Sequence, residues 1–261
     1  MYMSKRIAQA FANNNKAFIP FITGGDPDIA TTEKLLYALD KAGADIIEIG
    51  IPFSDPIAEG PVIEAAAERA LKMGCTVDML FDLIMRVRGD INAAILFMTY
   101  YNPVYAYGVG KFTARAQATG LDGLIVPDLP FEERDELLKP CHDNGLELIS
   151  LIAPTSENRI DNIAKHSGGF LYCMSSPSMT GERDEMDPFS KNMIRLAKAA
   201  SDVPCCIDFG IENATQVKIL AKLADGVIVG SAMVKLIEKY GEDSVQHVYA
   251  LAKEIKGAIL M

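Results

Sequence analysis

The sequence contains no tryptophan, only three histidines and no long apolar stretch. No apolar run approaches the roughly 20 residues that a membrane-spanning helix needs, so the sequence predicts no such helix. The N-terminus, residues 1–16, is polar and amphipathic and lacks the apolar centre of a secretory signal peptide. We therefore expect a cytoplasmic protein.

Positive charge is also scarce. The chain has 25 lysine and arginine residues against 35 acidic ones, which gives a formal net charge of −10. Because nucleic-acid backbones are bound by clustered lysine and arginine, this composition argues against a nucleic-acid partner. A small anionic ligand is still compatible with it, since backbone N–H groups can hold a phosphate whatever the net charge.

Neither the histidines nor the cysteines have the spacing expected of a metal site or of a catalytic nucleophile triad. His142, His166 and His247 lie in helical or helix-end patterns, which argues against a histidine metal site or nucleophile triad. The five cysteines form no CxxC pair and no Cys/His ligand spacing, and several lie in apolar runs, so we expect reduced core thiols. They are Cys75, Cys141, Cys173, Cys205 and Cys206. Acid–base chemistry must then come from carboxyl groups or tyrosines.

The chain does have a regular alternation of short apolar runs and helical patterns. With 49% apolar residues it can bury a large core. Eight runs are mostly continuous rather than alternating, as expected of parallel strands covered on both faces. We predict strands at 17–23, 45–50, 93–99, 123–126, 147–152, 169–173, 204–208 and 226–229.

Amphipathic segments separate these runs. We predict helices at 31–42, 61–72, 76–88, 132–144 and 189–200, and Gly43 and Gly145 follow two of them as stop signals. Eight βα units in 261 residues predict an α/β fold, a single (β/α)₈ TIM barrel over residues 1–261. It would have an extra N-terminal helix and an extra helix after strand two. A doubly wound open sheet is the alternative, and length alone also allows two domains.

Barrel active sites lie at the C-terminal ends of the strands, and there Glu48 stands out. It is a carboxyl group in the isoleucine-rich run 45–50, predicted to point into the barrel mouth. Burying an unpaired charge is costly, so such a group is usually functional or paired. A structural hydrogen bond or ion pair is the alternative. The loop acids Asp55 and Glu59 are weaker candidates, because loop carboxylates are mostly solvated.

Glycines near the ends of strands seven and eight indicate an anion site. Gly210 follows one strand, and Gly230 and Ser231 follow the other at the start of a helix, where N–H groups favour negative charge. Barrel phosphate sites are frequently built from these two loops. Capping of the helix by Ser231 is the alternative. The polar segment 172–183 is long enough for a lid that excludes water, or for plain flexible surface.

Six segments, in the same order along the chain, resemble those of the tryptophan synthase alpha subunit family. They are 18–23, 48–56, 98–103, 126–130, 152–155 and 226–232, and together they span nearly the whole chain. The lack of tryptophan is in keeping with an enzyme of tryptophan synthesis.

The resemblance implies a carbon–carbon lyase that cleaves indole-3-glycerol phosphate to indole and glyceraldehyde 3-phosphate by a retro-aldol reaction. It implies no cofactor in this chain and an α₂β₂ complex whose beta subunit carries pyridoxal phosphate. A stand-alone lyase, and a slow or inactive barrel that mainly binds and activates a beta subunit, are the alternatives. A generic phosphate-binding isomerase would not account for segment 48–56.

The resemblance also assigns roles by position. Glu48 matches the general acid–base, Glu59 the second catalytic carboxylate that accepts the indole N–H, and Tyr172 a tyrosine near the reacting centre. The substrate-binding positions are Phe21, Tyr100, Leu129, Thr180 and Phe209, and the phosphate-binding positions are Gly181, Gly210, Gly230 and Ser231.

Two departures from the family pattern bear on activity. The second carboxylate of the family is an aspartate, and the extra methylene of Glu59 shifts the acid by about one bond; a misplacement of ~1 Å can cost on the order of 10²-fold in rate. Either the loop is re-shaped to fit, or the enzyme is slow.

The second departure is in the lid. It reads Ser178-Met179-Thr180-Gly181 after Ser176-Pro177, where the family has Gly-Val-Thr-Gly. The change predicts restricted loop motion, and it leaves coupling to a beta subunit open.

Overall fold

The structure is a computed structural model that describes residues 4–12, 16–174, 188–208, 210 and 214–260. Strands and helices alternate along this part of the chain. The strands are β1 (Ala17–Thr23), β2 (Ile46–Gly50), β3 (Ala94–Met98), β4 (Gly123–Ile125), β5 (Glu147–Ile152), β6 (Leu171–Met174), β7 (Cys205–Asp208) and β8 (Gly226–Val229). The helices on the first half of the barrel are α1 (Lys5–Ala10), α2 (Ile29–Ala42), α3 (Pro61–Lys72), α4 (Val77–Val87), α5 (Tyr101–Tyr107) and α6 (Val109–Thr119). Those on the second half are α7 (Asp135–Asp143), α8 (Ile160–Lys165), α9 (Pro188–Ala200), α10 (Ala214–Leu220), α11 (Ser231–Tyr240) and α12 (Ser244–Ile259).

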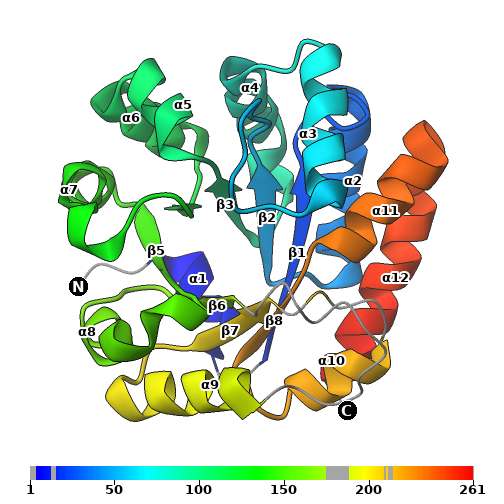
Figure 1. Ribbon diagram of the computed structural model, residues 1–261. Coiled ribbons are helices and arrows are strands. Elements are labelled where there is room, and N and C mark those ends of the chain that lie inside the picture. The colour runs from blue at the N-terminus through cyan, green and yellow to red at the C-terminus, as the bar shows by residue number, and fades with distance from the viewer. Residues whose placement is uncertain (1–3, 13–15, 175–187, 209, 211–213, 261) are drawn as a thin grey trace.

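The strands form a closed parallel barrel in chain order, and β8 pairs with β1 to complete it. Helices surround the strands on the outside (Figure 1), because each parallel connection has to cross back along the sheet. The predicted (β/α)₈ barrel is confirmed, and the open-sheet alternative is wrong. The extra helices at the N-terminus (α1) and after β2 (α3 and α4) are also confirmed. Within the described residues, no helix has the length and hydropathy of a membrane span.

The barrel has an inner and an outer apolar core, since successive side chains of a strand point to opposite faces. Ile46 and Leu96 belong to a buried cluster formed by the strands and α1. Phe97, the next residue after Leu96, packs in the larger cluster between strands and helices. All five cysteines are free and buried, as predicted from their positions in apolar runs.

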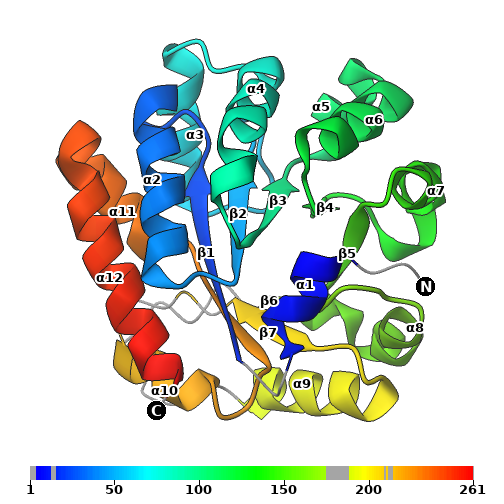
Figure 2. The same ribbon diagram turned by 180° about the vertical axis from the view of Figure 1, so that it is seen from behind.

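Helix α1 closes the N-terminal end of the barrel (Figure 2). Its Ile7 and Ala10 are buried, and the Phe11 ring lies 6.0 Å from the ring of Phe170. The Ser4 hydroxyl donates a hydrogen bond of 2.5 Å to Asp122. The active sites of such barrels lie at the opposite end, where the strands terminate.

Glu147, a buried carboxyl group at the start of β5, gives a stability prediction. One of its oxygens has no hydrogen-bond partner within the described residues, and burial raises its pKa to about 7. A carboxyl group whose pKa is raised on folding holds its proton more tightly in the folded protein. Its contribution to stability is complete below the pKa of the unfolded chain and is lost as the pH rises from there through about 7. We expect Glu147→Gln to raise the melting temperature at pH 8 by about 2–4 °C, the equivalent of about 1 kcal/mol, and less at pH 5.

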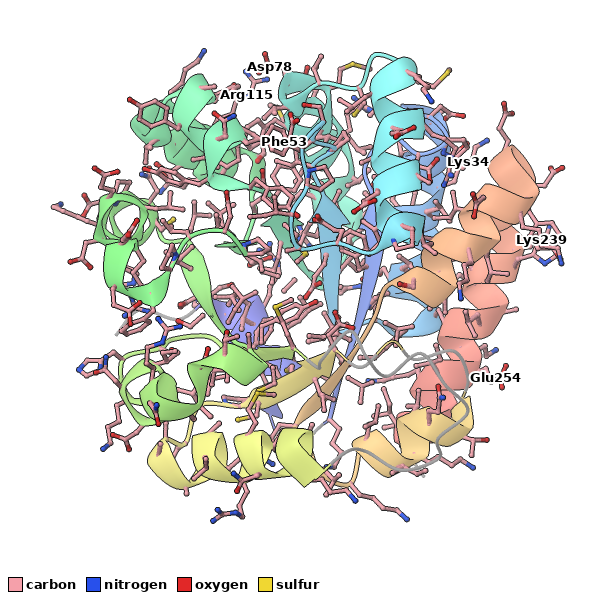
Figure 3. The ribbon with its side chains drawn as sticks, in the orientation of Figure 1. Lys34, Phe53, Asp78, Arg115, Lys239 and Glu254 are labelled. Carbon is pink, nitrogen blue, oxygen red and sulfur yellow. The ribbon has the colours of Figure 1, made fainter. Side chains whose placement is uncertain are left out.

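Thermal denaturation at the two pH values checks this, with the exposed Glu254→Gln as the matched control. Figure 3 shows the Glu254 side chain on the outside of the molecule. A larger gain at pH 5 than at pH 8 would contradict the role given to Glu147.

Candidate active site

Glu48 lies in the middle of β2 with its side chain fully buried. It follows the inward-facing Ile46 by two residues, so it points into the barrel, where Phe21 and Leu96 flank it on the neighbouring strands. Neither of its carboxyl oxygens has a hydrogen-bond partner within the described residues, which argues against a structural hydrogen bond or ion pair. Burial, and after it the negative charge of Asp208, raise the pKa of Glu48 well above its ordinary value. Glu48 is therefore a candidate proton donor.

Tyr172, inward-facing on β6, is bound to an acid that the sequence analysis did not select. Its hydroxyl donates a hydrogen bond of 3.0 Å to Asp208 at the end of β7. The backbone amide of Gly210 also donates to this carboxyl group. A carboxyl group that ends an apolar strand was the signal available in the run 204–208.

Glu59 lies in the loop between β2 and α3, which is fastened to Tyr100. The Tyr100 hydroxyl accepts hydrogen bonds from the amides of Ile57 (3.0 Å) and Ala58 (2.9 Å), and it donates to the carboxyl group of Glu59. Burial is the main cause that raises the pKa of Glu59 to about 7. The loop thus holds the longer Glu59 side chain against the barrel mouth.

Phe21, Glu59 and Tyr100 line one narrow cavity. The Phe53 ring, labelled in Figure 3, forms part of its wall and lies 5.4 Å from that of Tyr100. The Phe21 ring fits because Gly50, two residues beyond its β2 partner Glu48, has no side chain: a Cβ there would lie 2.6 Å from the Phe21 ring. Aromatic walls with one carboxyl group suit a flat heterocycle that carries an N–H.

Leu129 does not join this cavity. It follows β4 and lines a neighbouring groove with Pro130 and Phe131. Of the segment 172–183 predicted as a lid, residues 172–174 belong to strand β6, and residues 175–183 lie outside the described residues. Thr180, Gly181, Phe209 and the lid positions Ser176, Pro177 and Ser178 lie outside the described residues.

Gly230 and Ser231 lie where β8 meets α11. Gly230 is the N-cap residue of this ten-residue helix, and no side-chain hydrogen bond caps it, so the alternative of a capping Ser231 is wrong. The first N–H groups of a helix have no partner within the helix and favour an anion. Gly210, with φ of 58°, uses its amide to hold Asp208.

Comparison with known proteins agrees with this arrangement. Residues 7–259 match the family described as tryptophan synthase alpha chain. The alpha chain of Halalkalibacterium halodurans is 46% identical, over 89% of this chain and 88% of its own length. Tryptophan synthase subunit alpha of Legionella pneumophila superposes with a TM-score of 0.89 at 36% identity, covering 98% of this chain and 97% of its own. A chain of the tryptophan synthase α₂β₂ complex of Pyrococcus furiosus gives 0.87 at 37%, covering 92% and 98%. The chain therefore belongs to the tryptophan synthase alpha chain family.

Proposed function

We propose that this chain cleaves indole-3-glycerol phosphate to indole and glyceraldehyde 3-phosphate, with Glu48 as the general acid–base. The family match confirms the predicted family and the predicted class of reaction, a carbon–carbon lyase. The observation that carries the role of Glu48 is its fully buried carboxyl group inside the barrel, which has no hydrogen-bond partner among the described residues. A carboxylic acid kept protonated in this way has a proton to give near neutral pH.

The reaction moves one proton onto carbon and one off oxygen. Glu48 donates its proton to the indole ring carbon that bears the glycerol chain. Its carboxylate then takes the proton of the neighbouring glycerol hydroxyl. A carbonyl group forms there, the carbon–carbon bond breaks, and its electron pair returns to the indole ring. A single carboxyl group thus ends the cycle in the acid form in which it began.

Positive charge develops on the indole ring when its carbon is protonated, and Glu59 is the proposed acceptor of the ring N–H. In its ionised form the Glu59 carboxylate stabilises that charge, and the hydroxyl of Tyr100 holds it in place. The rings of Phe21 and Tyr100 pack against the indole, and Tyr172 lies near the reacting carbon atoms. We propose Thr180 and Phe209 as the further contacts of the indole end of the substrate, whereas Leu129 lines a different groove.

The phosphate group binds at the start of α11. The backbone N–H groups at Gly230 and Ser231 give it a cradle of positive partial charge, and Gly181 and Gly210 complete the proposed set. This chemistry uses side chains and amides of this chain alone.

For the assembly we propose a complex with a tryptophan synthase beta subunit. The Pyrococcus furiosus relative forms an α₂β₂ complex, and we infer the same heterotetramer here, with pyridoxal phosphate on the beta subunit. A cytoplasmic location and a single domain over residues 1–261 complete the proposal. The placement of Glu59 against Tyr100 favours an active lyase over an inactive binding module.

Binding of indolepropanol phosphate, which carries both the ring and the phosphate but no scissile bond, tests the substrate class. At a concentration of about 100 Kd it should stabilise the fold by about 2.7 kcal/mol and raise the melting temperature by several degrees. Indolepropanol and inorganic phosphate are the matched controls and should protect far less. Equal protection by inorganic phosphate alone would indicate a generic phosphate-binding barrel instead.

A further inference from the structure

Asp208 is a second carboxyl group inside the barrel that the proposed reaction leaves without a task. It ends β7, on the strand beside Tyr172, and burial raises its pKa. Among the described residues, the ionisable groups that act on Glu48, Tyr172 or Asp208 come from three strands. They are Glu48 on β2, Tyr172 on β6, and Cys206 and Asp208 on β7. The strands beside β2 face Glu48 with the apolar Phe21 and Leu96.

The two carboxyl groups have opposite surroundings. Asp208 accepts hydrogen bonds from the Tyr172 hydroxyl and the Gly210 amide, which favour its ionised form. Glu48 accepts none within the described residues, so its burial favours the neutral form. When two carboxyl groups inside the barrel interact, the one with hydrogen-bond donors ionises first, and its charge opposes ionisation of the other. Asp208 is thus the carboxylate and Glu48 the carboxylic acid.

We propose that Asp208 is a positioning residue for the lyase reaction, which orients the Tyr172 hydroxyl and keeps Glu48 in its acid form until the substrate binds. The inference rests on the proposed function of Glu48. The charge of Asp208 also explains why Glu48 takes up a proton again. Once Glu48 has protonated the ring carbon, its carboxylate lies near a second negative charge, and taking up the glycerol hydroxyl proton relieves the repulsion.

Asp208→Asn tests the charge, because asparagine has the same size and can still accept from the Gly210 amide. In the dependence of kcat/KM on pH, the alkaline limb reports Glu48 and the acid limb Glu59. We expect the alkaline limb to move to lower pH by about one unit in Asp208→Asn, and the acid limb to stay. Asp161→Asn removes the same charge from the exposed surface of α8 and should leave both limbs unchanged.

A readout that needs no turnover separates this proposal from the proposed function. The infrared carbonyl band of protonated Glu48 is obtained by subtracting the spectrum of Glu48→Gln. It should disappear at lower pH in Asp208→Asn than in wild type. If the band shifts although the wild type releases no indole, the pairing of the two acids stands and the proposed function fails. If the band titrates at the same pH in both proteins, the proposal for Asp208 is overturned.

The orienting role is tested with Tyr172→Phe, which keeps the carboxyl group of Asp208 and deletes the hydroxyl. We expect kcat to fall about tenfold with KM nearly unchanged. In the double variant with Asp208→Asn, the loss in kcat should be smaller than the product of the two single losses, because the two groups act together. Losses that multiply would overturn the orienting role.

Discussion

Replacing Glu48 by glutamine is expected to lower kcat for indole release by on the order of 10³-fold, without loss of stability. Glutamine has nearly the same shape but can neither give nor take the proton, and general acid–base catalysis contributes roughly 10²–10⁴-fold. The fold should not suffer, because no hydrogen bond to Glu48 is broken within the described residues. Steady-state indole release and thermal denaturation of the same samples measure both quantities.

Glu147→Gln is the matched control, since it makes the same substitution at the other buried strand carboxyl group, at the N-terminal end of the barrel. It should leave kcat within about twofold of wild type, because it lies away from the chemistry. Normal turnover by Glu48→Gln would contradict the mechanism. A large drop in its melting temperature would contradict the claim that the carboxyl group has no structural bond.

Shortening Glu59 to aspartate is expected to lower kcat rather than raise it, by about 10–100-fold. The loop is fastened to Tyr100 through the amides of Ile57 and Ala58, and the same hydroxyl donates to Glu59. A side chain one methylene shorter no longer reaches the Tyr100 hydroxyl. A displacement of ~1 Å can cost on the order of 10²-fold in rate. Kinetics of indole release at pH 8 measure the loss.

The pH dependence gives a second reading of Glu59. Because it acts as a carboxylate and burial raises its pKa to about 7, activity should rise with pH through about 7 in wild type. Glu59→Gln should lose this limb. Tyr100→Phe removes the hydroxyl that anchors the loop but keeps the carboxyl group of Glu59. It should lower kcat as well, by less than Glu59→Gln does. A nearly silent wild type that Glu59→Asp restores would instead indicate a slow or repurposed member whose main role is to bind its partner.

The barrel could be predicted from the sequence because its signals are local. Continuous apolar runs fixed the strands to within about two residues, and the glycines after helices marked their ends. The errors have physical causes. The run 169–173 begins at a glycine with φ of 63°, a conformation outside the strand region, so β6 starts later. Helix α2 starts earlier than predicted, because the Asp28 side chain caps it by accepting from the Thr31 amide at 2.7 Å.

The site was predicted less completely, because it depends on contacts between strands far apart in sequence. Glu48 could be selected since a carboxyl group in an isoleucine-rich strand is conspicuous by itself. Asp208 could not be selected from the sequence, because its role depends on Tyr172 on the neighbouring strand and on Glu48 across the barrel. Helix α5 was missed as well: its three tyrosines and one proline give seven residues little helical propensity, and its place is set by packing.

Indole release from indole-3-glycerol phosphate by the purified chain, alone and with a tryptophan synthase beta subunit, tests the central claim most directly. We predict measurable release by the wild-type chain alone, faster release with the beta subunit, and none above background for Glu48→Gln in either condition. Absence of release by wild type in both conditions, with indolepropanol phosphate still bound, would contradict the account and indicate a barrel that only binds.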